Sequence, residues 1–152
     1  MKILVINPGS TSTKIAVYEN ETPLLVRNIK HTVEELSVYP QVIDQFEFRK
    51  NLVLQELEAN GIPFAFDAVI GRGGLVKPIP GGVYAVNEAM KQDTLHAMRT
   101  HACNLGGLIA AELAASLPDC PAFIADPGLW FSCNTASNGC SFFSASIFAL
   151  EA

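Results

Sequence analysis

The sequence has few charged residues and no long apolar run, and these two absences exclude several classes of protein. Charged residues make up 16% of the 152 positions and apolar residues 49%, which is typical of a globular chain and not of a disordered one. No basic stripe accompanies the net charge of −5, so nucleic acid and anionic membrane surfaces are not expected partners. No apolar stretch approaches the roughly 18 residues that cross a bilayer. The apolar start at residues 1–6 is too short for a secretory signal. We therefore expect a cytoplasmic protein with a domain-sized core.

Metal-ligand spacing is also missing from the cysteines. They form no CxxC pair, and no histidine stands beside them at the spacing of zinc ligands. We interpret them as reduced, mostly buried thiols of a cytosolic protein. The four are Cys103, Cys120, Cys133 and Cys140.

Short apolar runs separated by turn signals predict an α/β domain with a mixed sheet. The chain opens with three strands that form a β-meander, predicted at residues 2–6, 13–19 and 24–29. Further short strands are predicted at 66–70 and 121–125, with a loop rich in glycine and proline over 71–82.

Three helices are predicted between these strands. Apolar spacing predicts the first over 41–59, with Asn60-Gly61 after its end. Asn87 is expected to cap a second helix that ends near Met98, and Asn104 a third that ends before Pro118.

The last 25 residues differ from the rest in composition. Between Gly128 and Ala152 the only charged residue is Glu151, and the segment shows neither helical nor strand periodicity. We expect residues 1–127 to form the folded lobe, and 128–152 to be a disordered or aberrant tail.

The strongest chemical signal is the turn Asn7–Lys14, which joins the first two strands. Gly9 lets the backbone approach a ligand closely, and four hydroxyl side chains and Lys14 follow it. Convergent N–H and hydroxyl donors with one lysine suit a phosphate group. The order is not that of a P-loop, and a strand follows instead of a helix. The alternative is an ordinary polar hairpin turn.

Three further positions are candidates for chemistry, each with a structural alternative. Arg72, between glycines after a predicted strand, could hold a carboxylate with its planar fork, or be a surface arginine. Asp126, at the end of a strand, could bind Mg²⁺ or orient a reacting group, or cap a turn. His101, near Asn104, could stabilise a transferring phosphoryl group, or cap a helix.

The two other histidines, His31 and His96, have no supporting context, and we predict that both are surface residues.

These segments, taken in order, resemble the butyrate kinases, which belong with acetate kinase to the superfamily of sugar kinases, actin and Hsp70. The resemblance covers residues 1 to about 127. It is carried by the strands around Asn7–Lys14, by residues 45–50, by 67–87 with the loop after Gly71, and by 104–107 through 125–127.

The resemblance implies a fold and a reaction. The fold would be a ribonuclease H-like lobe of the actin and sugar-kinase type, built on a five-stranded mixed sheet, from a two-lobed enzyme. The reaction would move the γ-phosphoryl group of ATP onto butyrate or a similar short-chain carboxylate, with Mg²⁺, in a homo-oligomer.

By match to the motifs of that family, the resemblance also implies residue roles. Asn7, Ser10, Ser12 and Lys14 would contact phosphates and the water shell of the metal. Arg72 would hold the substrate carboxylate and His101 would face the phosphoryl group. Asp126, with Asn7, would serve the metal site.

After Pro127 the sequence departs from the family pattern, and the second-lobe motifs have no counterpart. We therefore expect a truncated or frame-shifted reading of a longer gene. Two other functions stay open: a catalytically inert fragment with weak phosphate binding, and a nucleotide switch without enzyme activity. Arg72 argues against the switch, which has no need of a carboxylate clamp.

Overall fold

The computed structural model describes residues 1–77, 79–97 and 100–127. The predicted tail at 128–152, with Cys133 and Cys140, and the expected helix end at Met98 lie outside the described residues. Within the described part of the chain, no helix is long and apolar enough to cross a membrane.

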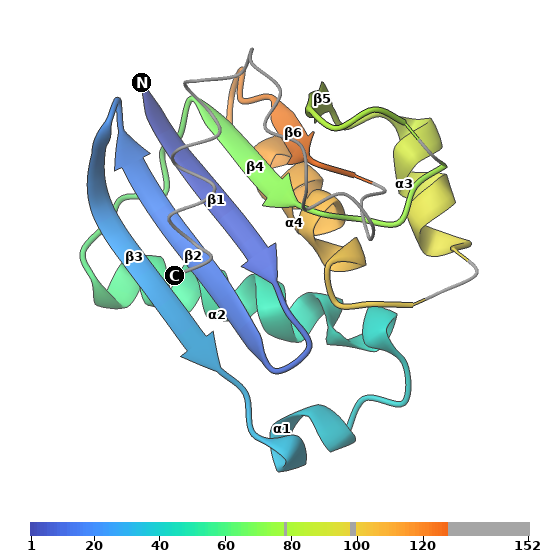
Figure 1. The fold of residues 1–152 in the computed structure, drawn as a ribbon. Coiled ribbons are helices and arrows are strands. Elements are labelled where there is room, and N and C mark those ends of the chain that lie inside the picture. The colour runs from blue at the N-terminus through green and yellow to red at the C-terminus, as the bar shows by residue number, and fades with distance from the viewer. Residues whose placement is uncertain (78, 98–99, 128–152) are drawn as a thin grey trace.

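One mixed sheet of six strands organises the described residues, in the order β3-β2-β1-β4-β6-β5 (Figure 1). Strand β1 pairs in parallel with β4, and β4 in parallel with β6, whereas the other pairs are antiparallel. The strands are β1 (Lys2–Pro8), β2 (Ser12–Glu19), β3 (Thr22–Lys30), β4 (Ala68–Arg72), β5 (Val83–Ala85) and β6 (Ala122–Ala125). The predicted mixed sheet is therefore present, but it has six described strands and not the expected five.

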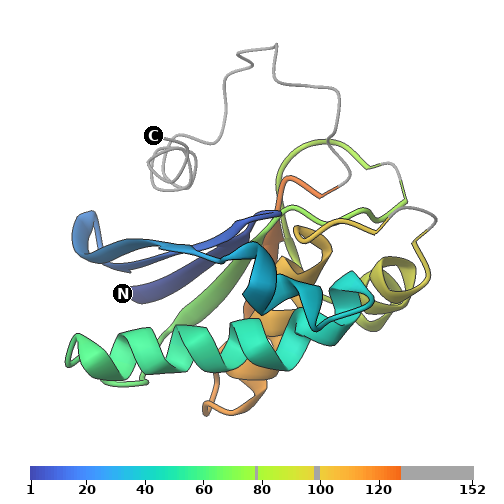
Figure 2. The same cartoon turned by 90° about the horizontal axis from the view of Figure 1, so that it is seen from below.

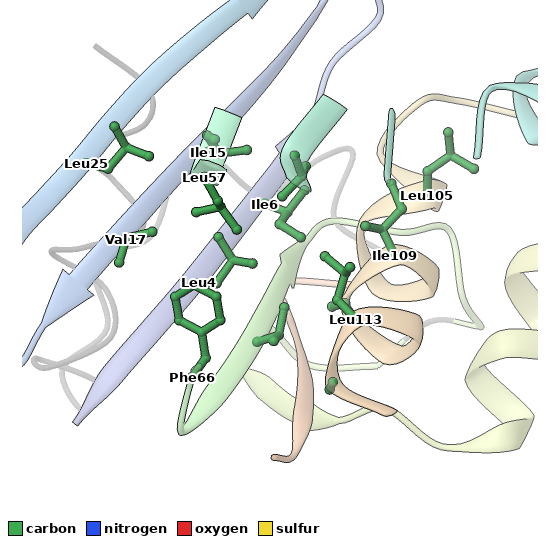
Figure 3. Packing of buried hydrophobic residues seen from close by; sticks show 14 residues of the cluster. Leu4, Ile6, Ile15, Val17, Leu25, Leu57, Phe66, Leu105, Ile109 and Leu113 are labelled. Atoms are coloured by element: carbon green, nitrogen blue, oxygen red, sulfur yellow. The ribbon is translucent and has the colours of Figure 1, made fainter. Parts of the chain in front are cut away.

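The two long helices pack on one face of this sheet (Figure 2). Val53 and Leu57 from α2 and Ile109 from α4 share a buried core with Leu4 and Ile6 of β1 (Figure 3). A fully buried side chain of this kind stabilises the fold by roughly 1.5–3 kcal/mol. The helical elements are α1 (Val33–Ser37), the 3₁₀ helix η1 (Val42–Gln45), α2 (Phe46–Ala59), α3 (Glu88–Leu95) and α4 (Asn104–Ala115).

The opposite face of the sheet carries a second, smaller apolar cluster. Its buried members are Val5, Ala16, Tyr18, Ile70 and Ala125. Because side chains alternate between the faces of a strand, Ile15 and Val17 of β2 face the helices while Ala16 and Tyr18 face the other way. The strand predicted at residues 13–19 is thereby confirmed.

Two short elements were not expected from the sequence. Helix α1 has no buried residue, so it lacks an apolar pattern. Its start is nevertheless marked by a capping box, in which Thr32 accepts from the N–H of Glu35 and the Glu35 side chain accepts from the N–H of Thr32. Strand β5 has only three residues, too few to show a period.

Several predicted boundaries were shifted. The strand expected at 66–70 forms at Ala68–Arg72, so Gly71 and Arg72 belong to β4 and not to the loop. The first turn of the helix expected over 41–59 is the 3₁₀ helix η1. Asn60 ends α2 as predicted, followed by Gly61 in the left-handed region, with φ of 65°.

The two predicted helix caps have different outcomes. Asn87 caps α3, since its side chain accepts from the N–H of Met90, and that helix ends at Leu95. The prediction for Asn104 was wrong, because Cys103 is the N-cap of α4. Asn104 is the first helical residue, and its Oδ1 accepts from the N–H of Leu75 at 3.0 Å.

Helix α4 touches strand β4 through glycine backbones. A Cβ atom on Gly71 would overlap the carbonyl of Gly106 and lie 2.5 Å from the nitrogen of Gly107. A Cβ on Gly106 would lie 2.7 Å from the carbonyl oxygen of Arg72. Glycine is therefore required at these positions, and it brings the start of α4 against the end of β4.

We predict that Gly71→Ala destabilises the protein by about 3 kcal/mol, the upper end of the cost of overpacking a core. The added methyl group meets backbone atoms, which cannot rotate away. Urea denaturation measures the change. Gly9→Ala is the control, because its Cβ would lie at an ordinary contact distance of 3.5 Å. An equal loss of stability in both variants would contradict this account.

Candidate functional site

Three of the predicted site residues lie at one edge of the sheet, where the parallel strands β1, β4 and β6 end. Ile6 pairs with Gly71, so Asn7 and Arg72 follow at the same level. Arg72 pairs with Ala125, and Asp126 comes next. Ligands of open α/β sheets bind outside the carboxyl ends of the strands, so this edge is the candidate site.

The turn between β1 and β2 rises from the same edge. Asn7 lies opposite Lys14 in the antiparallel register, and the N–H of Gly9 donates to the carbonyl oxygen of Ser12 at 2.7 Å. Ser10 is exposed and Ser12 is half-buried. All four predicted phosphate-binding residues therefore lie in this turn or beside it. We call residues 7–14 the phosphate hairpin.

Arg72 and the start of α4 lie close together. Burial raises the pKa of the Cys103 thiol. The N–H of Gly74 and the charge of the Arg72 guanidinium lower that pKa, by less than burial raises it. Gly73, with φ of 76°, packs against Cys103, since a Cβ there would lie 2.9 Å from the Cys103 Cβ. Asn104 binds the backbone of Leu75. The loop after Arg72 is thus held against the N-terminus of α4.

His101 precedes α4 and has the local capping role that we considered as its alternative. Its Nδ1 accepts from the N–H of Cys103 at 3.2 Å, and its carbonyl oxygen accepts from the N–H of Asn104 at 2.9 Å. An accepting Nδ1 leaves the proton on Nε2, so the imidazole can still donate a hydrogen bond. The side chain is half-buried.

Asp126 takes part in a reciprocal contact with Gly82, the residue before β5. Its N–H donates to the carbonyl oxygen of Gly82 at 2.8 Å, and its Oδ1 accepts from the N–H of Gly82 at 3.2 Å. Its φ of 49° lies in the left-handed region, where aspartate is enriched and which recurs at functional sites. Asp126 therefore braces a turn, as its alternative predicted, at the edge where the other candidates gather.

No group of three or more His, Cys, Asp and Glu side chains suited to a metal ion occurs among residues 1–77, 79–97 and 100–127. Cys103 and Cys120 are half-buried free thiols.

A buried polar network beneath the phosphate hairpin was not foreseen from the sequence. Arg49 of α2 is fully buried, and its Nη1 donates to the Thr13 hydroxyl at 2.8 Å and to the carbonyl oxygen of Ser12 at 3.0 Å. Gln45 accepts from its Nε and Nη2 at 3.0 and 2.9 Å. The sequence signal was an arginine on the apolar face of α2, at helical spacing from Val53.

His31 joins this network, and the prediction that it is a surface residue was wrong. It is 8% exposed, its Nε2 lies 2.8 Å from the Thr13 hydroxyl oxygen, and its ring meets the Phe48 ring edge-on. Burial and the Arg49 charge lower the pKa of His31, while Glu35 acts weakly in the opposite direction. His96 is exposed, as predicted.

Comparison with known proteins finds relatives for most of the chain. No model of a known protein family matches the chain. Over 129 residues it is 99% identical to a protein named probable butyrate kinase from Bacteroides thetaiotaomicron, a match that covers 85% of this chain and 36% of that protein. A probable butyrate kinase from Phocaeicola vulgatus is 57% identical over 127 residues, 84% of this chain and 36% of that protein.

The predicted resemblance to the butyrate kinases is therefore confirmed over the matched residues. The chain spans about a third of the length of these curated relatives. An acetate kinase from Entamoeba histolytica has a similar structure, with a TM-score of 0.51 and 12% identity over 82% of this chain and 36% of that one. This confirms the predicted fold class, a single mixed-sheet lobe of the acetate kinase type.

We predict that the free energy of unfolding falls as the pH is lowered through 6.5. Unfolded His31 takes up a proton near pH 6.5, whereas the folded residue stays neutral to lower pH, so the unfolded state binds more protons in this window. One such proton changes stability by at most about 1.4 kcal/mol per pH unit. Urea denaturation between pH 7.5 and 5.5 measures the slope.

Two histidine substitutions test whether His31 causes this pH dependence. His31→Gln should flatten the slope, because glutamine does not titrate. His96→Gln, at an exposed position, should leave the slope unchanged. A slope that is the same in the parent and in both variants would exclude His31 as its source.

Proposed function

We propose that this chain provides the phosphate- and carboxylate-binding lobe of a butyrate kinase, which transfers the γ-phosphoryl group of ATP to a short-chain carboxylate. The observation that carries the proposal is the meeting of the phosphate hairpin, Arg72 and the start of α4 at one sheet edge. The identity to proteins named probable butyrate kinase supports butyrate as the acceptor. A cytoplasmic setting and a homo-oligomeric whole protein are part of the same proposal.

The proposed division of labour follows the position of each residue. Asn7, Ser10, Ser12 and Lys14 contact the phosphates, because the hairpin offers hydroxyl and N–H donors beside one ammonium group. Arg72 holds the substrate carboxylate with its fork. His101 donates from Nε2 to the phosphoryl group in transfer.

The chemistry requires positioning more than proton transfer. A carboxylate oxygen attacks the γ-phosphorus, the bond to the β-phosphate oxygen breaks, and butyryl phosphate and ADP result. Because the nucleophile is already ionised, no general base is needed. The site must instead hold two anions together and offset their repulsion. This suits a site with Lys14 on β2 and Arg72 on β4, the two strands that flank β1.

The residues present fit a magnesium ion bound together with phosphates. Mg²⁺ prefers oxygen ligands and takes one or two carboxylates plus phosphate oxygens and water. Asp126 offers a carboxylate whose Oδ1 is oriented by Gly82, and Asn7 offers an amide oxygen at the same edge. When bound, the ion supplies charge neutralisation at the phosphates. Asp126 orients it or the nucleophile.

Residues 1–127 make up this lobe in our proposal, and 128–152 lie outside it. A second candidate is phosphate binding without turnover. It is favoured by the match to only 36% of the length of the relatives, because the proteins named as kinases are much longer. Incubation of the chain with butyrate and MgATP, with detection of butyryl phosphate, separates the two candidates.

We predict that Lys14→Gln weakens the binding of inorganic tripolyphosphate by about tenfold, which corresponds to about 1.4 kcal/mol. Lys14 adds a charge beside the hydroxyl donors, and hydrogen bonds to charged groups are the stronger ones. Amide shifts of residues 9–12 in an NMR titration give the affinity. Lys91→Gln removes the same charge from α3, where Lys91 pairs with Glu88, and serves as the control. Equal weakening by both substitutions would indicate nonspecific attraction.

We also predict that Arg72→Ala raises the KM for butyrate about tenfold or more in a form of the protein that turns over, because a bidentate charged pair is lost. Initial rates at varied butyrate concentration measure the effect. Arg27→Ala is the control, since Arg27 lies on β3 and donates to Asn60. An unchanged KM in Arg72→Ala would remove Arg72 from the substrate role.

A further inference from the structure

Arg49 is the most buried charged residue of the described chain, and the proposed reaction does not use it. It has no accessible surface, and it lies on the face of α2 that packs against the sheet. Burying an ionised group is costly unless hydrogen bonds compensate. The hydrogen bonds of Arg49 must therefore offset the cost of its burial, and their partners indicate what the residue does.

All hydrogen-bond partners of the Arg49 guanidinium are neutral. They are Gln45 on its own helix, and Ser12 and Thr13 of the phosphate hairpin. No carboxylate forms an ion pair with it within the part of the chain that the structure describes. Burial lowers the pKa of Arg49 to about 10, so the group is still protonated at neutral pH. A positive charge without a paired carboxylate thus lies directly beneath the hairpin.

The carbonyl oxygen of Ser12 is where Arg49 acts on the hairpin. This oxygen accepts from the N–H of Gly9 at 2.7 Å, the bond that closes the turn, and from Arg49 Nη1 at 3.0 Å. The bond from Arg49 orients the same carbonyl that defines the turn. It therefore holds the turn closed, and with it the direction of the N–H groups of Ser10 and Thr11.

Thr13 is the second residue of the hairpin that Arg49 binds, and its hydroxyl group also contacts His31. Its hydroxyl oxygen accepts from Arg49, which can only donate, so its own hydrogen is available for His31 Nε2. A neutral His31 with its proton on Nδ1 satisfies this chain. Arg49 thereby ties α2, the hairpin and the residue after β3 into one unit.

Arg49 and Lys14 place positive charges on opposite sides of the sheet at the hairpin. Thr13 shares its face with Ile15 and Val17, which pack against the helices, while Lys14 shares its face with Ala16 and Tyr18. Arg49 reaches the hairpin from the helix side. A phosphate at the turn would accordingly experience positive charge from Lys14 and, in a low-dielectric surrounding, from Arg49.

We propose that Arg49 is a positioning residue that holds the phosphate hairpin in its binding shape through Ser12 and Thr13. The proposal has two parts. The first is that Arg49 fixes the shape of the hairpin, and it is tested without any ligand. The second is that this shape binds phosphate, and this part rests on the proposed function.

The first experiment measures amide hydrogen exchange by NMR in the ligand-free 152-residue chain and in Arg49→Gln. Loss of Arg49 should free the Ser12 carbonyl and speed exchange of the Gly9 amide about tenfold, a factor that corresponds to about 1.4 kcal/mol. Exchange of the Val17 amide, in the middle of β2, reports global opening and is used to correct for lost stability. The second experiment titrates both proteins with inorganic tripolyphosphate, and the affinity should fall several-fold in the variant.

Lys50→Gln is the matched control. It removes a positive charge one residue further along the same helix, where Lys50 contacts Glu47 and Glu112 and not the hairpin. If Arg49→Gln does not fold, Thr13→Val and Thr13→Ser replace it. Valine removes the hydroxyl that accepts from Arg49, and serine retains it, so only valine should speed Gly9 exchange.

The outcomes separate the inference from the proposed function. Gly9 exchange that is unchanged in a folded Arg49→Gln, or raised equally in Lys50→Gln, overturns the positioning role. If exchange responds as expected but the parent chain does not bind tripolyphosphate, the positioning half stands and the proposed phosphate site fails. Faster Gly9 exchange together with weaker tripolyphosphate binding in Arg49→Gln supports both the positioning role and the proposed phosphate site.

Discussion

The contact between the backbones of Gly71 and Gly106 is the constraint on which the candidate site depends. It lets the start of α4 lie against the end of β4, with no side chain between them. The loop after Arg72 is then held by Asn104 and Cys103, and His101 is brought to the same edge. Parallel pairing of β1, β4 and β6 places the phosphate hairpin and Asp126 beside them. Two glycines and two parallel strand pairings thus gather residues that are up to 119 positions apart in the chain, from Asn7 to Asp126.

The second feature of the site is that its polar hairpin is built on buried polar groups. A turn of small residues has little apolar surface with which to fix its own shape. Here the shape is set from beneath, by a guanidinium that binds a main-chain carbonyl and a buried hydroxyl. Removing the Arg49 charge from water is costly, whereas its hydrogen bonds are directional. This combination is expected where a fixed shape of the hairpin matters more than the stability of the fold.

Sequence reasoning found the parts of the fold that have strong local signals. The short apolar runs, the turn at Asn7–Lys14 and the cap at Asn87 are local signals, and they predicted the meander and α3. The boundary of β4 was missed because Phe66 packs into the core from outside the strand. Asn104 was misassigned because its side chain bonds to Leu75, a contact that no local pattern contains.

The site was predicted as a set of residues but not as an arrangement. Local motifs identified Asn7, Lys14, Arg72, His101 and Asp126, and the strand register then placed Asn7, Arg72 and Asp126 at one edge. The network of Arg49 and His31 was missed, since its partners come from η1, α2, β2 and the residue after β3. Such a network has no sequence period, and only the tertiary fold brings it together.

The central claim is that a metal–nucleotide binds at the carboxyl edge of β1, β4 and β6. The most direct measurement is paramagnetic broadening of backbone amide signals by MnATP in the 152-residue chain. The account predicts selective loss of signal at Gly9–Ser12, Gly73 and Asp126, with Asn20 and Asp67 at the opposite edge unaffected. Broadening at that opposite edge, or at the acidic pair Glu34 and Glu35 alone, would contradict it.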